Sequence, residues 1–428
     1  MTANYNWPLW RRIAFRFCFL YFGLYLITTP WFEFSGIPML GGWHAAVLDF
    51  FVCGFNDHVI HFQKELTPLN GSGDTSWGWV LLILELSVSA IATVIWSWLD
   101  RKRPSYNRLG YLLRTGLRYT LSYFALTYGL IKILLIQMLF PTQSQLASPL
   151  GDFLPMRFSW LFIGYSDGYQ FFSGMAEVLV GLLLLFRRTT RLGAVLAFGV
   201  FLNVMALNLF YDIPVKIFSM HLTAMALFLL IDDNQGLLHF FWHNRTISTI
   251  SKYHFSSQRK WVKRGRIALK VAFIYMLSMM IFDTFNMYSD YHKSDEPFAK
   301  GVFETHVLIK NNDTIPVLAN DSLVWKDIIF DGAESGSIDS QDTILRLRYG
   351  RGYFLYKNDS VKNVLHAFKF NDGDSIAMFD LKYKILNKDS IEFRTKLHGD
   401  SLKLLSVKTK HKFQLANREF HWISERNR

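Results

Sequence analysis

Seven stretches of mostly apolar residues, each about 20 residues long, fill the first two thirds of this 428-residue chain. They lie near residues 11–30, 77–99, 117–140, 169–187, 191–210, 214–232 and 266–285. About 20 helical residues, at about 1.5 Å each, cross the roughly 30 Å of hydrocarbon in a bilayer. The pattern therefore predicts a polytopic α-helical membrane protein with about seven transmembrane helices.

The net charge of +12 comes mainly from Lys and Arg in the short connections between these stretches. The clusters lie at residues 11–12, 101–103, 187–191 and 259–266. Because cytoplasmic loops carry such an excess, we expect a plasma (inner) membrane protein with a cytoplasmic N-terminus and an extracytoplasmic C-terminal domain. Membrane topology accounts for the charge, so the expected partner is the lipid bilayer and not nucleic acid.

From about residue 290 the pattern changes to short alternating segments separated by clusters of Asn, Asp, Gly and Ser. Such clusters are typical of tight turns between antiparallel strands. The expected strands lie at residues 303–310, 323–330, 344–349, 353–357, 364–370, 376–386, 391–397 and 402–409. We predict a C-terminal antiparallel all-β barrel or sandwich, which resembles a lipocalin-like barrel. Alternation does not tell whether such a barrel holds a ligand or has a packed core.

These patterns divide the chain into four regions. They are an N-terminal two-helix membrane region at 1–105 with an outer loop at 31–76, a four-helix membrane core at 106–235, a basic cytoplasmic loop with the last transmembrane helix at 236–289, and the β-domain at 290–428. Within the outer loop, the apolar residues 45–62 predict an amphipathic helix on the outer surface.

Five polar residues interrupt five different apolar stretches: Glu85, Lys132, Glu177, Asn203 and His221. All lie about seven or eight residues from the predicted outer ends, which predicts one polar layer. A charge near the bilayer centre costs at least about 2.5 kcal/mol to insert, so such residues need partners or a purpose. We expect Lys132 to pair with Glu177. The layer is either a functional site or a structural contact that fixes the helix register, and His221 is open to the same two interpretations.

The predicted outer mouth of the bundle holds Asn208, Tyr211, Asp212 and Lys216 around Pro214. These residues form a polar vestibule above the layer, or else Asp212 caps the following helix. The loop at residues 70–75 is either a turn that caps the helix from Trp77 or a glycine-rich loop for a headgroup.

His58 and His61 lie three residues apart beside Asp57, but no third ligand is evident, so we predict no metal site.

Residues 118–232 resemble the four-helix core of the DoxX family. The matching residues are Arg118, Tyr128-Gly129-Leu130-Ile131-Lys132, Phe162-Ile163-Gly164-Tyr165-Ser166, Tyr169, Gly174-Met175-Ala176-Glu177, Gly181 and Arg191-Leu192-Gly193-Ala194. The two helices before this core, the one after it and the β-domain are additions to the family pattern.

The DoxX resemblance implies a redox-linked protein that binds a quinone or a lipid and serves as an accessory or subunit of a membrane oxidoreductase. It implies a redox partner in the membrane or periplasm and, as cofactor, a quinone. The expected catalytic residues are Lys132, Glu177, His221 and Glu85. The expected cofactor-binding residues are Tyr128, Tyr169, Asn203, Asn208, Tyr211, Asp212 and Lys216.

Two alternatives stay open. One is a non-enzymatic envelope protein whose helices anchor the β-domain for a partner. The other is a transporter of a small solute or of protons, although the paired repeats typical of transporters are not evident.

Overall fold

The computed structural model describes residues 6–31, 38–231, 259–292, 298–316, 324–332, 334–371, 374–409, 413–417 and 422–423. Two compact units make up the chain. The first comprises Met1–Met138 and Ser166–Tyr288, and the second comprises Leu139–Tyr165 and Ser289–Arg428. Residues 139–165, which the sequence assigned to the four-helix region, thus belong with the β-domain. Residues 236–258 of the predicted cytoplasmic loop lie outside the described residues.

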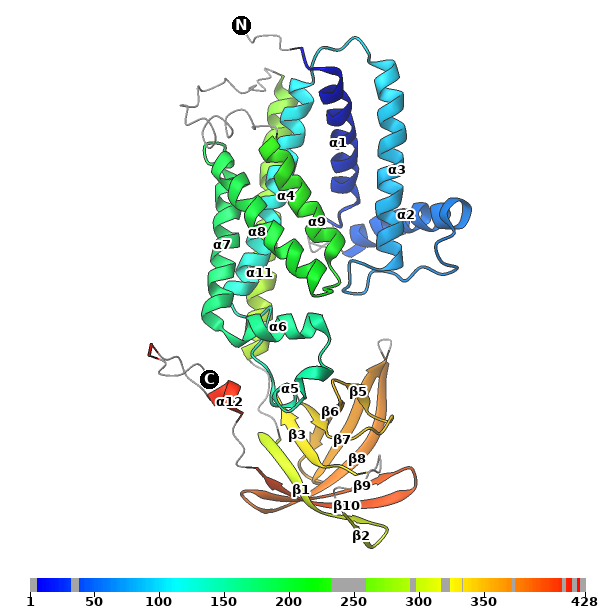
Figure 1. Cartoon of the computed structure of the whole chain (residues 1–428), viewed down its shortest axis with the longest axis vertical. Coiled ribbons are helices and arrows are strands. Elements are labelled where there is room, and N and C mark those ends of the chain that lie inside the picture. Colours follow the sequence, from blue (N-terminus) through cyan, green and yellow to red (C-terminus); the bar gives the residue numbers. More distant parts are fainter. Residues whose placement is uncertain are drawn as a thin grey trace. The chain divides into compact units, whose positions relative to one another are not determined.

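The first unit is helical, and each of the seven apolar stretches forms a helix in it (Figure 1). Its helices are α1 (Leu9–Thr28), α2 (Pro38–Phe55), the π-helical η1 (Asn56–Ile60), α3 (Ser76–Leu99), α4 (Asn107–Ile133), α7 (Asp167–Leu185), α8 (Thr190–Phe210), α9 (Lys216–Ile231) and α11 (Lys260–His292). Among the described helices, four are long and apolar enough to cross a membrane: α3, α7, α8 and residues 260–290 of α11. Helix α9 is apolar but has only 16 residues.

Helix α4 differs in its bounds from the apolar stretch at 117–140 that predicted it. It begins ten residues earlier and ends at Ile133. Leu135 then adopts a left-handed conformation with φ 58°. The Leu135 amide donates to the Lys132 carbonyl, and the Ile136 amide donates to the Ile131 carbonyl. This is the hydrogen-bond pattern of a Schellman helix end, here formed without the usual glycine.

Helix α1 is fixed to the connection between α3 and α4 by two arginines. Arg16 is 1% exposed, and its guanidinium donates to the Tyr106 hydroxyl at 2.8 Å and to the Asp100 carbonyl at 2.7 Å. Arg12 donates to the carbonyls of Arg101 and Arg103 at 3.1 and 3.0 Å. The start of α1 and residues 100–106 therefore lie side by side.

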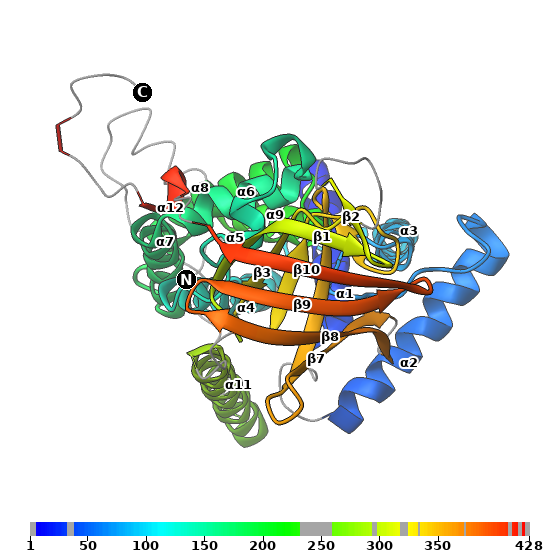
Figure 2. The ribbon, with the colours of Figure 1, turned by 90° about the horizontal axis from the view of Figure 1, so that it is seen from below.

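The second unit contains a closed antiparallel β-barrel (Figure 2). Its strands are β1 (Gly301–Lys310), β2 (Asp313–Ile315), β3 (Asp327–Asp331), β4 (Ser335–Ile338), β5 (Arg346–Arg348), β6 (Arg351–Asp359), β7 (Val364–Asn371), β8 (Asp374–Asn387), β9 (Ser390–Leu397) and β10 (Asp400–Lys408). Eight of them form the ring β1-β3-β4-β6-β7-β8-β9-β10, which closes because β10 pairs with β1. The short strands β2 and β5 pair with β1 and β6 outside the ring. The prediction of a barrel is confirmed, and the sandwich alternative is wrong.

All eight predicted strands are present, but β2 and β4 were missed. Strand β4 has the small polar sequence Ser-Gly-Ser-Ile, without an alternating apolar pattern. A side chain at Gly336 would lie 2.7 Å from the ring of Phe354 and 2.6 Å from the Ile329 carbonyl. Glycine is therefore required where β4 approaches its neighbours closely.

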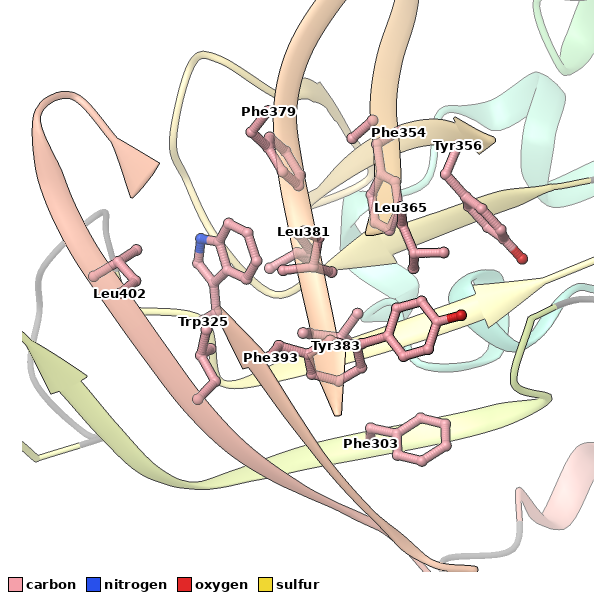
Figure 3. Packing of buried hydrophobic residues seen from close by; sticks show 14 of the residues in the cluster. Phe303, Trp325, Phe354, Tyr356, Leu365, Phe379, Leu381, Tyr383, Phe393 and Leu402 are labelled. Carbon is pink, nitrogen blue, oxygen red and sulfur yellow. The ribbon is translucent and has the colours of Figure 1, made fainter. Parts of the chain in front are cut away.

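The barrel interior is filled with apolar and aromatic side chains (Figure 3). The indole of Trp325 is fully buried, with its ring centroid 5.4 Å from that of Phe379. The ring centroid of Phe330 lies 5.6 Å from that of Tyr356 and 6.0 Å from that of Phe393. The sequence left open whether the barrel holds a ligand or has a packed core. The described residues form a packed core.

Residues 139–165 bind to the barrel through buried polar contacts. They form the short helix α5 (Gln143–Leu146), the 3₁₀ turn η2 (Leu150–Asp152) and α6 (Pro155–Tyr165). Ser144 is fully buried; the Ser337 hydroxyl donates to its hydroxyl at 2.7 Å, and its amide donates to Asp331 at 3.2 Å. Arg351 donates to the Ser337 hydroxyl at 2.9 Å and pairs with Asp327. Because these groups satisfy one another away from water, the segment is an integral part of the barrel unit.

We expect the barrel to lose stability in acid partly through Asp400. Hydrogen bonds from Asn311 and Lys310 lower the pKa of this carboxyl. A lowered folded-state pKa stabilises the fold above the unfolded value, about 3.9, and this contribution is lost as the pH falls through the folded value. Asn311→Ala should make unfolding less steeply pH-dependent between about pH 4 and pH 2, as measured by circular dichroism of the β signal. An unchanged pH dependence would contradict this role.

Candidate functional site

Helices α4 and α7 cross at very close range because three glycines lie in their interface. A side chain at Gly174 would lie 2.7 Å from the Gly129 carbonyl and 2.9 Å from the Ile133 amide nitrogen. A side chain at Gly181 would lie 2.6 Å from Leu126. The Ser122 hydroxyl, one turn before Leu126 on α4, donates to the Gly181 carbonyl at 2.8 Å. Small residues and interhelical hydrogen bonds of this kind are typical of packed membrane helices.

This crossing places the predicted pair together. Lys132 Nζ lies 2.5 Å from Glu177 Oε1, and their side chains are 9% and 2% exposed. The second carboxylate oxygen, Glu177 Oε2, is buried and has no hydrogen-bond partner among the described residues. The predicted pairing is confirmed. The prediction that Lys132 lies seven or eight residues from the end of its helix is wrong, because α4 ends at Ile133 and Lys132 lies in its last turn.

Glu85 has a different partner. The Thr28 hydroxyl at the end of α1 donates to Glu85 Oε1 at 2.5 Å. Glu85 is 2% exposed, in the middle of α3. The carboxyl group is therefore held at the seam between α1 and α3.

His221 is held by two hydrogen bonds and a stacked ring. Its Nδ1 lies 2.7 Å from the Ile217 carbonyl, which can only accept, so Nδ1 carries a proton. In the neutral ring, Nε2 then accepts a hydrogen bond from the Tyr21 hydroxyl at 2.7 Å. The Tyr25 ring lies parallel to the imidazole, with 3.9 Å between centroids. His221 is thus a fully bonded core residue that also belongs to the polar cluster.

Tyrosines lie beside these groups. The rings of Tyr21 and Tyr25 both stack on His221, at centroid distances of 5.7 and 3.9 Å. The Tyr128 ring centroid lies 6.0 Å from Lys132 Nζ. Helices α1, α3, α4, α7 and α9 thus contribute buried and half-buried polar side chains, which we define together as the polar cluster: Tyr21, Tyr25, Thr28, Glu85, Tyr128, Lys132, Glu177 and His221.

Asn203 and Tyr169 do not join the polar cluster. The Asn203 side chain is exposed on α8, and Tyr169 is 50% exposed in the first turn of α7. The buried face of α8 carries Ala197, Phe201 and Asn208. Asn203 follows Phe201 by two residues, about 200° around the helix, and so lies on the opposite face.

The four residues of the predicted vestibule lie at the turn between α8 and α9, which a loop covers. The Gly73 amide and the Ser72 hydroxyl both donate to the Pro214 carbonyl, at 2.9 and 3.3 Å. The amides of Lys216 and Ile217 donate to Asp74 at 2.8 and 3.0 Å. Asp74 therefore caps α9, and the prediction that Asp212 does so is wrong.

The remaining vestibule residues also have local roles. Asp212 has an exposed side chain that pairs with Lys216 at 2.7 Å. Asn208 donates to the Val215 carbonyl at 3.5 Å, and Tyr211 ends α8. In the loop before α3, Thr75 accepts from the Gly78 amide, so the predicted cap of that helix is present.

We expect Asp74→Ala to lower the free energy of unfolding by about 1 kcal/mol, because α9 loses its cap. The matched control is Asp212→Ala, which removes a surface ion pair and should change it by less than about 0.5 kcal/mol. Thermal unfolding of the two variants in detergent tests this. Equal losses would show that Asp74 is no more important than an exposed pair.

The two histidines considered as metal ligands, His58 and His61, are exposed at η1 and directly after it. Among the described residues, no three His, Cys, Asp or Glu side chains are grouped so as to hold a metal ion.

The contribution of α1 to the polar cluster was not predicted from the sequence. Tyr21, Tyr25 and Thr28 follow one another at intervals of four and three residues, which places them on one helical face. Three hydroxyl groups on one face of an apolar stretch are the signal that identifies them.

Comparison with known proteins finds a partial likeness. No protein-family model matches the chain, and no solved structure matches it. A stretch of 83 residues, 19% of this chain, is 39% identical to the uncharacterized protein YwoB of Bacillus subtilis (strain 168). The chain spans about half, 54%, of the length of that relative. The polar cluster, and not this likeness, is therefore the basis for a functional inference.

Proposed function

We propose that all seven helices α1, α3, α4, α7, α8, α9 and α11 cross the membrane. Two segments that touch outside the membrane lie on the same side, so an even number of helices crosses between them. Arg12, near the start of α1, donates to the carbonyls of residues 101 and 103, which follow α3. Because α3 can cross the membrane, an even number of crossings between these two segments supports a crossing by α1 as well. Arg187 bonds to the Tyr111 hydroxyl, which supports α4 in the same way because α7 can cross.

The barrel unit supports the crossing by α9. Residues 139–165 and the barrel strands form one unit, and α7, α8, α9 and α11 are the described helices between them. Three of these four are long and apolar enough to cross, so an even number requires α9 as well. The basic clusters at residues 11–12, 101–103 and 187–191 support a topology with the N-terminus in the cytoplasm and the barrel outside.

We infer that the polar cluster binds the headgroup of a quinone or a similar amphiphile and that the protein serves a membrane oxidoreductase. The observation that carries this proposal is the buried Lys132–Glu177 pair with its open acceptor, Glu177 Oε2. A buried carboxylate oxygen without a partner is costly, which favours a ligand that donates to it. The DoxX resemblance, whose matching residues include Lys132 and Glu177, points to the same chemistry.

The chemical groups of the pair suit the oxygens of a quinone. A quinone supplies the redox chemistry, because its two oxygens take up protons as the ring is reduced by a partner oxidoreductase. Lys132 has three N–H donors, one of which is bonded to Glu177, and donates to a carbonyl oxygen. Glu177 Oε2 accepts from a hydroxyl group. Tyr128 and Phe218, with ring centroids 5.8 Å apart, provide an aromatic wall beside Lys132.

A second function is favoured by the binding of residues 139–165 to the barrel. In that case the helices anchor and orient an exported domain that recognises a partner, and the Lys132–Glu177 pair serves only to hold α4 and α7 together. We also propose, as part of this second function, that the barrel is lipocalin-like.

Glu177→Gln separates the two functions. In nanodiscs, the whole protein should bind a short-chain ubiquinol analogue, whose hydroxyl groups can donate to Glu177 Oε2, and the variant should bind it at least about tenfold more weakly because a charged acceptor is lost. Quenching of the intrinsic tryptophan fluorescence measures the affinity. The matched control is Asn203→Ala, whose side chain is polar but exposed on α8. Equal affinities of the wild type and Glu177→Gln, or no binding by either, would sink the quinone proposal and leave the anchor.

A further inference from the structure

Helix α2 has two apolar faces, of which one packs on α3. Val52 is fully buried against Trp77 and Val80, and Leu48 and Phe55 are half-buried in the same cluster. The cluster extends along the first turns of α3 to Leu84. The inner face of α2 is therefore fixed to the beginning of a helix that can span a membrane.

The other face of α2 is exposed and almost uncharged. Its large apolar side chains are each more than half exposed: Met39, Trp43, Val47, Phe50 and Phe51. They follow one another at intervals of three or four residues, except for the adjacent last two, and so form one helical face. Asp49 is the one charged residue of α2. Apolar patches of this kind mark a surface that is covered in the working protein.

Direction and depth indicate what covers this face. Figures 1 and 2 both show α2 lying across α3 and not along it. The hydrophobic cluster that α2 and α3 share reaches Leu84, the ninth residue of α3, which is about 12 Å from the first residue of that helix. On the α1 side, His44 Nε2 lies 2.9 Å from the Ile27 carbonyl, next to the Thr28 that binds Glu85. Helix α2 thus lies within one leaflet, beside the seam between α1 and α3.

We propose that α2 is an in-plane membrane helix whose exposed face lies among the acyl chains of the outer leaflet. A helix with an apolar face and few charges, held across the spanning helices at this depth, meets lipid before it meets water. A soluble partner does not reach that depth, and a second copy of the chain would shield the face from lipid. The proposal rests on the membrane topology proposed above and not on quinone binding.

The native cysteines provide the test. Cys53 lies on the exposed face of α2, so Cys18→Ala leaves it as a single site for an environment-sensitive NBD label. The protein is reconstituted in phosphatidylcholine vesicles with or without brominated acyl chains, and iodide serves as the quencher in water. Two matched controls carry one cysteine on a Cys18→Ala/Cys53→Ala background. They are Val94→Cys, exposed within α3, and Val361→Cys, exposed after β6.

We expect brominated lipid to quench the labels at Cys53 and Val94→Cys, and iodide to quench only the label at Val361→Cys. If iodide quenches Cys53 as strongly as Val361→Cys, α2 faces water and the proposal is overturned. If neither agent quenches Cys53, protein covers the face, which overturns it in favour of a second copy. If Val94→Cys also behaves like Val361→Cys, the membrane topology itself fails, so the two failures are distinguishable.

Discussion

Replacing Lys132 with Met should lower the free energy of unfolding by about 3 kcal/mol, because Glu177 is left buried without its counter-ion. The pair is 2.5 Å apart, and Glu177 is 2% exposed, so water does not compensate for the lost contact. Methionine keeps the length and apolar stem of lysine, so the effect comes from the charge. The measurement is chemical or thermal unfolding of the whole protein in detergent.

The double variant Lys132→Met/Glu177→Met is the control for this prediction. Replacing a buried pair with apolar groups of similar size is often nearly neutral, so the double variant should recover most of the loss. A difference between the double variant and the sum of the single ones measures the coupling of the two charges. If the single losses simply add, the two residues act independently and the pair has no energetic meaning.

Gly174→Leu should also lower the free energy of unfolding by about 3 kcal/mol, because α4 and α7 must move apart. The new side chain would meet backbone atoms of Gly129 and Ile133, which cannot turn aside as a flexible side chain does. Since Glu177 is three residues further along α7, we expect the same change to separate it from Lys132 and to weaken quinone binding.

The matched control for Gly174→Leu is Gly199→Leu, also within a helix. Nothing lies within 4 Å of a side chain at Gly199, so this change should be neutral or slightly stabilising through helix propensity. Unfolding and ligand binding of both variants are measured side by side. A loss at Gly199 equal to that at Gly174 would show that helix packing at the α4–α7 crossing is not the cause.

The helical stretches and the strands were predictable because burial in lipid or in a barrel imposes a period or a run length on the sequence. The pairing of Lys132 with Glu177 was predictable for a similar reason: two opposite charges in apolar surroundings have few other choices. Composition along the chain is enough where one property, such as the length of an apolar run or a pair of opposite charges, decides the structure.

Rotation about a helix axis was much less predictable. Asn203 was placed in the polar layer from its depth alone, but the face it occupies is set by Phe201 and its neighbours at helical spacing. The same information, applied to Tyr21, Tyr25 and Thr28, would have found the contribution of α1.

Two other long-range contacts left no trace in the sequence pattern. Helix α4 ends at Ile133 without the glycine that usually follows a helix end of this type. Beyond this end, the Met138 amide donates to the Gln170 side chain of α7 at 3.0 Å. The capping of α9 by Asp74 joins residues that lie 142 positions apart. Neither contact follows from local propensity, because each depends on where another helix lies.

The binding of residues 139–165 to the barrel has a consequence for biogenesis. Ser144 and Ser337, which share a hydrogen bond, are 193 positions apart, and α7, α8, α9 and α11 lie between them. Closure of the ring also waits for β10, the last strand. While the chain is being synthesised, residues 139–165 emerge long before the strands that bury them. In the topology proposed above, the barrel unit is therefore completed only after the last helix has been inserted and the tail exported, so an assembled barrel would report that the whole membrane part has reached its place.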